Sequence, residues 1–337
     1  MLSVHSYHDA NGFKALAGEW NELLHHSAAN TVFLTLEYQR TWWHHLGEGE
    51  LLILEVRDDG ELVGIASLLM TYNQQGQRVL KTTGCVDVSD YLDLIVAQGR
   101  EEAVYAAFLD CLASPGTLAW DLLDLCNIHQ DSPTLTVLPA LAEKRGWAVS
   151  TAKQDVCPVV RLPGTWEEYL QMLEGKYRRE IRRKLRRAED AATLFWYITG
   201  PEHDLEAEVE DFLRLMAAST QEKATFLTPR MRGFFHQLAR VAYNAGWLQL
   251  AFLEVEGRKA AAYLNFIYNN HVLVYNSGLD WRSFPRLGAG FVLTAYCIRH
   301  AIEQGRENFD FMRGSEHYKY RFGGQDVEVR QLAIHRV

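Results

Sequence analysis

Two glycines separated by one residue open a predicted helix in the segment Pro285-Arg286-Leu287-Gly288-Ala289-Gly290-Phe291. Where no Cβ stands in the way, backbone N–H groups approach a phosphate closely, and a helix N-terminus adds a positive partial charge. The segment therefore predicts a phosphate-binding loop made of Arg286, Leu287, Gly288, Ala289 and Gly290. A turn that binds no ligand is the alternative explanation of the same glycines.

A second segment places reactive side chains directly after the next predicted strand, with the sequence DFMRGSEHYKYRFG. Open α/β sheets bind their ligands at this end of their strands. Acyl transfer to an amine needs a base for the amine proton, an acid for a departing thiolate, and positive charge near the developing oxyanion. We expect Glu316, Tyr318 and Lys319 to supply these three functions.

The same segment begins with a carboxylate, Asp310, and a guanidinium, Arg313. We expect both to contact the substrate. The alternative is a polar loop that closes the sheet, in which Asp310 and Arg313 form a structural ion pair.

A third segment is strongly basic, because residues 176–187 (KYRREIRRKLRR) contain eight Lys or Arg side chains and one Glu. Apolar residues recur along it at helical spacing, so one face packs and the other is a dense positive surface. We expect Arg182 and Arg183 on that surface to bind an anionic group. The candidates are a CoA 3′-phosphate, a nucleotide-linked or lipid-linked sugar, tRNA or a membrane surface, and a solvated helix face is the alternative.

The elements around these segments predict a mixed α/β (α+β) fold. Strands over 248–255, 258–267 and 271–279 form an antiparallel meander, because Glu256-Gly257 and Asn269-Asn270 suit tight hairpin turns. A helix that ends at Gly305 follows, and then strands over 309–312 and 328–336. The order is a meander followed by a βαβ step.

The first half of the chain repeats this order. Strands over 51–57 and 61–72 flank the hairpin signal Asp58-Asp59-Gly60, and a helix over 101–113 precedes a strand over 120–125. A capping box at Thr165 opens a new helix after Pro158–Gly164. We therefore expect two similar domains, residues 1–160 and residues 161–337, each a mostly antiparallel sheet flanked by helices.

These motifs resemble the acetyltransferase family often labelled BioF2-like or CelD-like. The resemblance covers Leu51 to the C-terminus, and its most specific part is Gly314-x-Glu316-x-Tyr318-Lys319. This family is a branch of the GNAT acyltransferases found in bacterial exopolysaccharide and cellulose-related gene sets, and it is similar in architecture to the Fem aminoacyltransferases. The resemblance implies tandem GNAT-like acyl-CoA N-acyltransferase domains, with acetyl-CoA or another acyl-CoA as co-substrate. We expect no metal, because neither the cysteines nor the adjacent histidine pairs have the spacing of a metal site.

The segment Ser89-Asp90-Tyr91-Leu92-Asp93 also fits this family and occupies the place of the cofactor loop in the first half. It has no glycine and adds two carboxylates, which would repel a pyrophosphate. We therefore expect a single CoA loop, in the second domain, and we expect Asp90 and Tyr91 to line the acceptor site.

Three functions remain open from the sequence. The first is an acyl-CoA-dependent N-acyltransferase acting on a small-molecule or sugar-linked amine, such as an amino sugar or polysaccharide precursor. The second is a Fem-like transferase that uses aminoacyl-tRNA, and the third is a non-catalytic module that binds an anionic ligand.

Composition limits the remaining possibilities. A net charge of −9 disfavours indiscriminate nucleic-acid binding, and five widely spaced cysteines without a Cys-x-x-Cys pair argue against a disulfide framework or a zinc site. No apolar run approaches the roughly 18 residues of a transmembrane helix, and the first residues lack the pattern of a signal peptide. We therefore expect a cytoplasmic protein.

Overall fold

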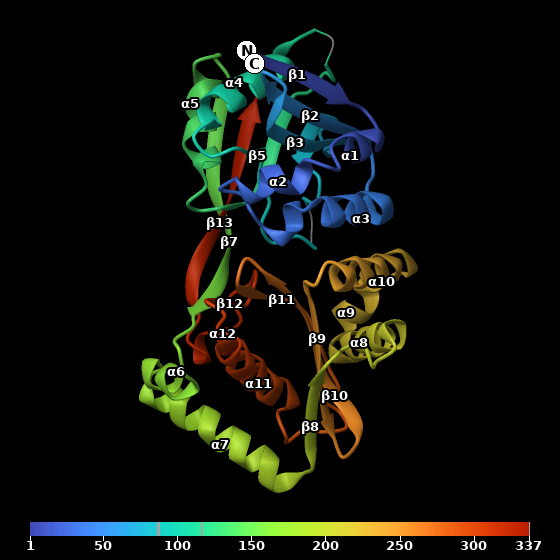
Figure 1. The fold of residues 1–337 in the computed structure, drawn as a ribbon, viewed down its shortest axis with the longest axis vertical. Coiled ribbons are helices and arrows are strands. Elements are labelled where there is room, and N and C mark those ends of the chain that lie inside the picture. The colour runs from blue at the N-terminus through green and yellow to red at the C-terminus, as the bar shows by residue number, and fades with distance from the viewer. Residues whose placement is uncertain (86–87, 116, 337) are drawn as a thin grey trace. The chain divides into compact units, whose positions relative to one another are not determined.

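The structure is a computed structural model that describes residues 1–85, 88–115 and 117–336. The chain divides into two compact units (Figure 1). Unit 1 contains Met1–Val156 and Val327–Val337, and unit 2 contains Cys157–Asp326. Both units are mixed α/β, with mostly antiparallel sheets flanked by helices, as the sequence predicts.

Unit 1 is built on a sheet with the strand order β1-β2-β3-β4-β6-β13-β7, and β5 pairs with β3. The antiparallel strands β1 to β4 are followed by the helix α4 and by β6, which runs parallel to β4. In chain order the elements are β1 (Leu2–Tyr7), α1 (Asn11–Ala15), α2 (Trp20–His25), η1 (Val32–Leu34), α3 (Leu36–Leu46), β2 (Glu50–Asp58), β3 (Glu61–Tyr72), β4 (Arg78–Thr82), β5 (Ile95–Val96), α4 (Glu101–Ala113), β6 (Leu122–His129), η2 (Pro133–Leu135), α5 (Val137–Glu143), β7 (Ala148–Arg161) and β13 (Gln325–His335).

Unit 2 repeats the order with the strands β7-β12-β11-β10-β9-β8. Here β8 to β11 are antiparallel, and α11 leads to β12, which runs parallel to β11. The elements are α6 (Trp166–Met172), α7 (Gly175–Ala191), β8 (Leu194–Ile198), α8 (Leu205–Ser219), α9 (Gln221–Phe226), α10 (Pro229–Asn244), β9 (Leu248–Val255), β10 (Arg258–Tyr268), β11 (His271–Leu279), α11 (Ala289–Glu303), β12 (Asn308–Asp310) and α12 (His317–Arg321).

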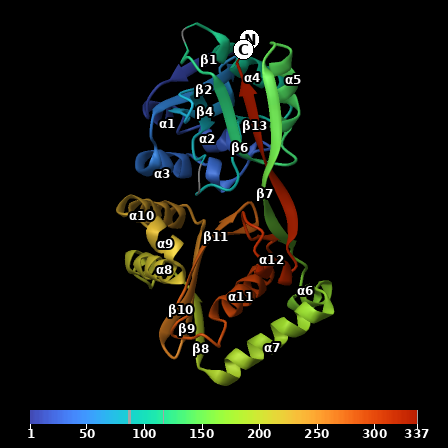
Figure 2. The ribbon, with the colours of Figure 1, turned by 180° about the vertical axis from the view of Figure 1, so that it is seen from behind.

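Helices cover both faces of the unit 2 sheet (Figure 1). The helix α11 packs on β9, β10 and β11 together with α6 and α7, which lie beside it when the molecule is seen from behind (Figure 2). The helices α8–α10 pack on the other face, where the backbone of Leu215 and Met216 in α8 closely approaches Gly278 of β11. A helix on each face buries the sheet, so its strands are apolar nearly throughout.

Local signals in the sequence account for several of these boundaries. The Oγ1 of Thr165 accepts a hydrogen bond from the backbone N–H of Glu168, which confirms Thr165 as the N-cap of α6, the first half of the predicted capping box. Asp59, Glu256 and Asn269 have positive φ values in the three predicted hairpin turns. The predicted strand over 309–312 ends at Asp310 because the backbone turns at Met312, which has a φ of +58°.

The division between the units differs from the predicted halves at one end of the chain. Strand β13 pairs with β6, from Val329 opposite His129 to His335 opposite Leu122, so the last residues belong to unit 1. Strand β7 begins in unit 1, and its end pairs with β12 in unit 2, with Val160 opposite Phe309. The predicted boundary at residue 160 therefore falls inside a strand.

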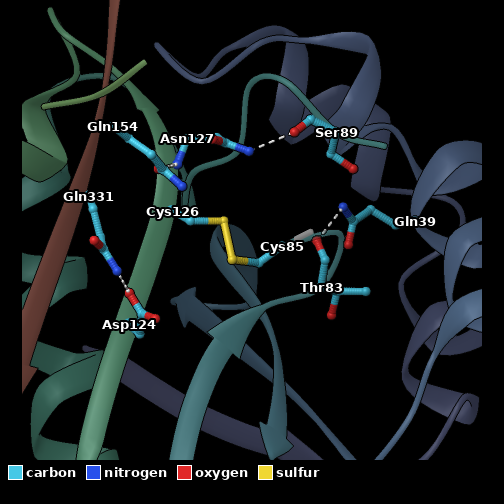
Figure 3. Close-up of a disulfide and its surroundings, with 9 residues drawn as sticks. All are labelled: Gln39, Thr83, Cys85, Ser89, Asp124, Cys126, Asn127, Gln154 and Gln331. Atoms are coloured by element: carbon cyan, nitrogen blue, oxygen red, sulfur yellow. Dashed lines mark hydrogen bonds between the residues drawn. A yellow bond between two sulfur atoms is a disulfide. The ribbon is translucent and has the colours of Figure 1, made fainter. Parts of the chain in front are cut away.

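The sequence argument against disulfides is wrong at one pair. Cys85 and Cys126 are 41 residues apart in sequence, but the fold brings their Cα atoms to 6.0 Å, and they form a disulfide (Figure 3). The side-chain amide of Asn127, the residue after Cys126, donates to the Ser89 carbonyl oxygen over 2.6 Å and also ties these two segments of unit 1 together. Sequence spacing missed the pair because β4 and β6 are neighbours only in the folded sheet.

Candidate functional site

The predicted phosphate loop has the conformation that its glycines suggest. Gly288 is the N-cap of α11, and its φ of +70° lies in the left-handed region that glycine favours. A Cβ atom built on Gly288 would meet nothing within 4 Å, so the backbone conformation, not crowding, requires glycine here. The first N–H groups of a helix have no partner within the helix, and α11 therefore presents donors and a positive partial charge at this loop.

A cavity of about 240 Å³ lies under the start of α11. Gly290 and Phe291 of α11 line it, and so do Ser277 of β11 and Tyr318 of α12. A Cβ atom built on Gly290 would approach no atom closer than the side chain of Leu279, at 3.7 Å. The fold therefore brings a residue of the predicted phosphate loop and a predicted catalytic residue to the same cavity.

Hydrogen bonds connect the wall of this cavity to the phosphate loop. The hydroxyl of Tyr263 is 2.8 Å from Oγ1 of Thr294, and Thr294 donates to the carbonyl oxygen of Gly290 over 2.8 Å. Burial raises the pKa of Tyr263 to about 12. Burial also raises the pKa of Tyr318 above its ordinary value, and the nearby Tyr263 and Glu316 raise it further. Tyr318 therefore keeps its proton near neutral pH and can donate it.

The predicted catalytic cation, Lys319, has a different environment from the one expected. Its side chain is 3% exposed, and Nζ donates to the carbonyl oxygens of Met312, Arg313 and Gly314, each over 2.9 Å. An ammonium has three N–H donors, and these three carbonyls occupy them. Lys319 therefore holds the turn that follows β12, where Gly314 has a φ of +111°.

Glu316 is the exposed member of the same group. Its carboxylate is 2.9 Å from Nζ of Lys319, and its side chain is 59% exposed. The buried ammonium of Lys319 thus stabilises the turn that follows β12, while the Glu316 carboxylate that it contacts stays accessible to solvent.

Asp310 and Arg313, which the sequence assigns to substrate binding, lie on the same turn. The carboxylate of Asp310 is buried and accepts the backbone N–H of Met312 over 2.7 Å. Neither residue lines the cavity under α11. The described contacts of Asp310 stabilise the turn.

The basic helix α7 separates into paired and unpaired cations. Arg182 pairs with Glu167 over 2.6 Å, and Lys184 pairs with Glu180 over 3.0 Å. Among the residues that the structure describes, Arg187 and three further exposed arginines of α7 form no ion pair, and these three share one side of the helix at i, i+4 and i+7 spacing: Arg179, Arg183 and Arg186. We call these three the arginine stripe.

A second cavity, of about 490 Å³, lies where α7 ends beside the phosphate loop. Arg187 from α7 and Arg286 from the loop both line it, together with Phe284. The structure therefore places Arg286 next to a cation of the basic helix, in a position suited to an anionic group.

The segment predicted to line an acceptor site, Ser89–Asp93, belongs to unit 1. The main chain of Tyr91 accepts from Thr31, and both Asp90 and Tyr91 are largely buried. Asp93 is buried and accepts from Ser132 Oγ and Thr134 Oγ1, over 2.5 Å each. Burial raises the pKa of Asp93 to about 6, although these hydrogen bonds oppose the shift.

Sequence reasoning missed Lys223, Tyr263, Ser277 and Thr294, which surround or adjoin the cavity under α11. Tyr263 and Ser277 lie directly opposite each other on β10 and β11. No local motif marks Tyr263 or Ser277, because a single polar residue inside an apolar strand acquires a function only through the strand pairing.

No described residues form a cluster of three or more His, Cys, Asp or Glu side chains that could hold a metal ion. In the part of the chain that the structure describes, no helix has the length and apolar character needed to cross a bilayer.

Comparisons with known proteins agree with this architecture. Residues 175–320 match the family model of the acetyltransferase (GNAT) domain. The chain is similar in fold to FemX (12% identity, TM-score 0.68, 97% of this chain and 96% of that chain) and to L-PGS from Bacillus licheniformis (14%, 0.59, 97% and 92%). It is also similar to a tandem GNAT protein from the clavulanic acid biosynthesis pathway (14%, 0.50, 98% and 98%). No curated protein sequence matches the chain. The second half of this chain therefore carries a GNAT acyltransferase domain, and the chain as a whole has the tandem GNAT fold that its sequence resembles.

Proposed function

We propose that this protein transfers an acyl group from an acyl-CoA thioester, such as acetyl-CoA, to an amine. The observation that carries the proposal is the cavity shared by Gly290, which belongs to the predicted phosphate loop, and Tyr318, a protonated phenol. A pyrophosphate bound at the start of α11 would leave the thioester arm within reach of this cavity. The volume and the largely apolar walls suit an acyl chain and its linker.

The residues of unit 2 suit the chemical steps. Glu316, which is exposed, accepts a proton from the attacking amine, directly or through water. Tyr318 donates its proton to the departing thiolate, whose own pKa is near 8.5. Lys319 acts indirectly, because its ammonium holds the turn that presents both side chains.

We further propose one CoA site per chain, at Arg286, Leu287, Gly288, Ala289 and Gly290. The corresponding segment of unit 1 has no glycine, and its Asp93 binds side chains of unit 1. Asp90, Tyr91, Asp310 and Arg313 stay our candidates for the acceptor side. The family resemblance favours an amino sugar or a polysaccharide precursor as acceptor.

Titration calorimetry with CoA and acetyl-CoA tests this function directly. We expect a stoichiometry of one per chain, together with thiol release when an amine acceptor is added. Two equivalent sites would refute the single-site proposal, and no binding of either compound would refute the acyl-CoA function.

A second candidate function is aminoacyl transfer from tRNA, and the arginine stripe favours it. Three unpaired guanidiniums on one helix face are suited to phosphate groups. Thermal shift with acetyl-CoA, longer acyl-CoAs and tRNA separates the two donors. Stabilisation by tRNA alone would favour the second candidate, and stabilisation by an acyl-CoA without any turnover would indicate a binding module.

A further inference from the structure

Lys223 lies beside the cavity under α11, although it comes from the opposite side of the sheet. It belongs to α9, whose N-cap Thr220 accepts the backbone N–H of Lys223 over 3.2 Å. Its Nζ donates to the carbonyl oxygen of Ser277 over 2.6 Å and to Ser277 Oγ over 3.2 Å. Because Ser277 lines the cavity, the ammonium contacts a residue of the cavity wall.

Lys223 reaches this position because β11 and β12 separate. The two strands pair only from His271 opposite Asn308 to Leu273 opposite Asp310. Beyond that point, the corner between α8 and α9 covers the outer edge of β11: Ser219 Oγ accepts the N–H of Leu279 over 2.8 Å, and Lys223 binds the Ser277 carbonyl. Helix α9 thus places a cation at the opening between the strands.

This cation has no anionic partner at ion-pair distance among the described residues. Its two acceptors are neutral groups of Ser277, so one N–H remains available. Burying an ammonium partly beside neutral groups alone carries a desolvation cost. Ionisable side chains in such surroundings are more frequent at functional sites. Burial lowers the pKa of Lys223 to about 8, while the nearby Glu316 carboxylate partly opposes the shift.

We propose that Lys223 is a catalytic residue whose ammonium stabilises the oxyanion formed during acyl transfer. The proposal rests on the acyl-transfer function above. The amine nitrogen forms a bond to the acyl carbonyl carbon while the carbonyl π electrons move onto oxygen, beside Lys223. The oxyanion then reforms the carbonyl and breaks the carbon–sulfur bond, Tyr318 protonates the thiolate, and Glu316 accepts the proton from nitrogen. Lys223 supplies the positive charge that the sequence assigned to Lys319.

The pH dependence of turnover distinguishes this role from a structural one. The titratable groups at the cavity or beside Lys223 among the described residues include Glu316 before α12, Tyr318 in α12, Tyr263 on β10 and the exposed Glu222 on its own helix. Burial raises the pKa of both tyrosines, so both keep their protons at pH 8. We therefore expect kcat/KM of the wild type to fall as the pH rises through about 8, where Lys223 loses its charge.

Two variants test this expectation. Lys223→Met should lower kcat about 100-fold, the loss typical of one oxyanion donor, and should abolish the alkaline fall. Lys223→Arg keeps the charge and should move that fall to higher pH. Lys144→Met, which removes an exposed lysine of unit 1, is the matched control and should behave as the wild type.

A binding measurement provides a readout that does not depend on turnover. Carboxymethyl-CoA carries a carboxylate near the position of the acyl oxygen. The wild type should therefore bind carboxymethyl-CoA more tightly than CoA. Lys223→Met should lose this preference but keep the wild-type CoA affinity and melting temperature. Unchanged kcat, pH profile and ligand preference in Lys223→Met would overturn the role of Lys223. A wild type that binds neither compound would instead refute the acyl-CoA function and the inference that rests on it.

Discussion

Alanine substitutions at the two loop glycines should have opposite effects on stability, and this contrast tests the assignment of the phosphate loop. Gly290 is in the first turn of α11, and a Cβ atom there would be 3.7 Å from the side chain of Leu279, an ordinary van der Waals contact. Alanine is favoured over glycine in a helix by up to about 1 kcal/mol. Gly290→Ala should therefore leave stability unchanged or raise it, by up to about 1 kcal/mol.

Gly288→Ala should instead destabilise the protein. Its φ of +70° places an alanine in the left-handed region, which costs an L-residue about 1–2 kcal/mol, and no contact would offset this cost because the surrounding space is open. For a unit of this size, a change of 1 kcal/mol moves the melting temperature by about 2–4 °C. Differential scanning calorimetry of the two variants measures both shifts.

Ligand affinity should not follow stability in this pair. The methyl group of Gly290→Ala projects toward the cavity of about 240 Å³, so we expect acyl-CoA to bind at least about tenfold more weakly, or about 1.4 kcal/mol, although the protein is no less stable. Titration calorimetry with CoA and acetyl-CoA measures this loss. Wild-type affinity in Gly290→Ala would refute the assignment of this cavity to the acyl-CoA, and destabilisation of Gly290→Ala comparable to that of Gly288→Ala would refute the structural reasoning.

Three further predictions concern catalysis, the basic helix and pH. Glu316→Gln and Tyr318→Phe should each lower kcat tenfold or more, about 1.4 kcal/mol, with CoA affinity nearly intact, and full kcat in both would remove them from the active site. Replacing the arginine stripe with Gln should weaken binding of an anionic donor or acceptor and flatten its salt dependence without loss of folding, whereas an unchanged salt response would indicate a solvated helix face. The pKa of Asp93 is raised to about 6 in the folded protein from a value of 3.8, so the unfolded state loses this proton at lower pH than the folded state does. The free energy of unfolding should therefore fall by up to about 3 kcal/mol as the pH rises from about 4 to 6. Urea denaturation of Asp93→Asn across this range should lack that decrease, and a decrease equal to that of the wild type would contradict the assignment to Asp93.

Much of the fold could be predicted from the sequence where the signal is local. The turn at Asp58-Asp59-Gly60 and the cap at Thr165 were identified correctly because a positive φ or an unsatisfied helix N–H selects particular residues at that position. The helix over 101–113 matches α4, since its apolar periodicity is carried by neighbouring residues. The glycine at 288 belongs to the same class, because its left-handed conformation is a property of its own backbone.

The site could be predicted only in part, because residue type reveals a chemical group but not its surroundings. Tyr318 was identified from its phenol, and the fold places it at the cavity beside the glycine loop. Lys319 was chosen for its charge, but three carbonyl oxygens of a turn that forms only in the folded chain occupy its donors. The sequence analysis overlooked Lys223, because it is a single lysine in a short helix with no motif around it.

The sequence by itself determined the turns, the helix caps, the repeated element order and the chemical groups before α11 and after β12, because each depends on residues close together in the chain. Tertiary structure decided which of these groups meet. It paired β13 with β6, joined Cys85 to Cys126, and brought Lys223 across the open edge of β11 to Ser277, 54 residues away in sequence. Such contacts depend on strand pairing and helix packing over long separations, and neither leaves a signature in the residues on one side of the contact alone.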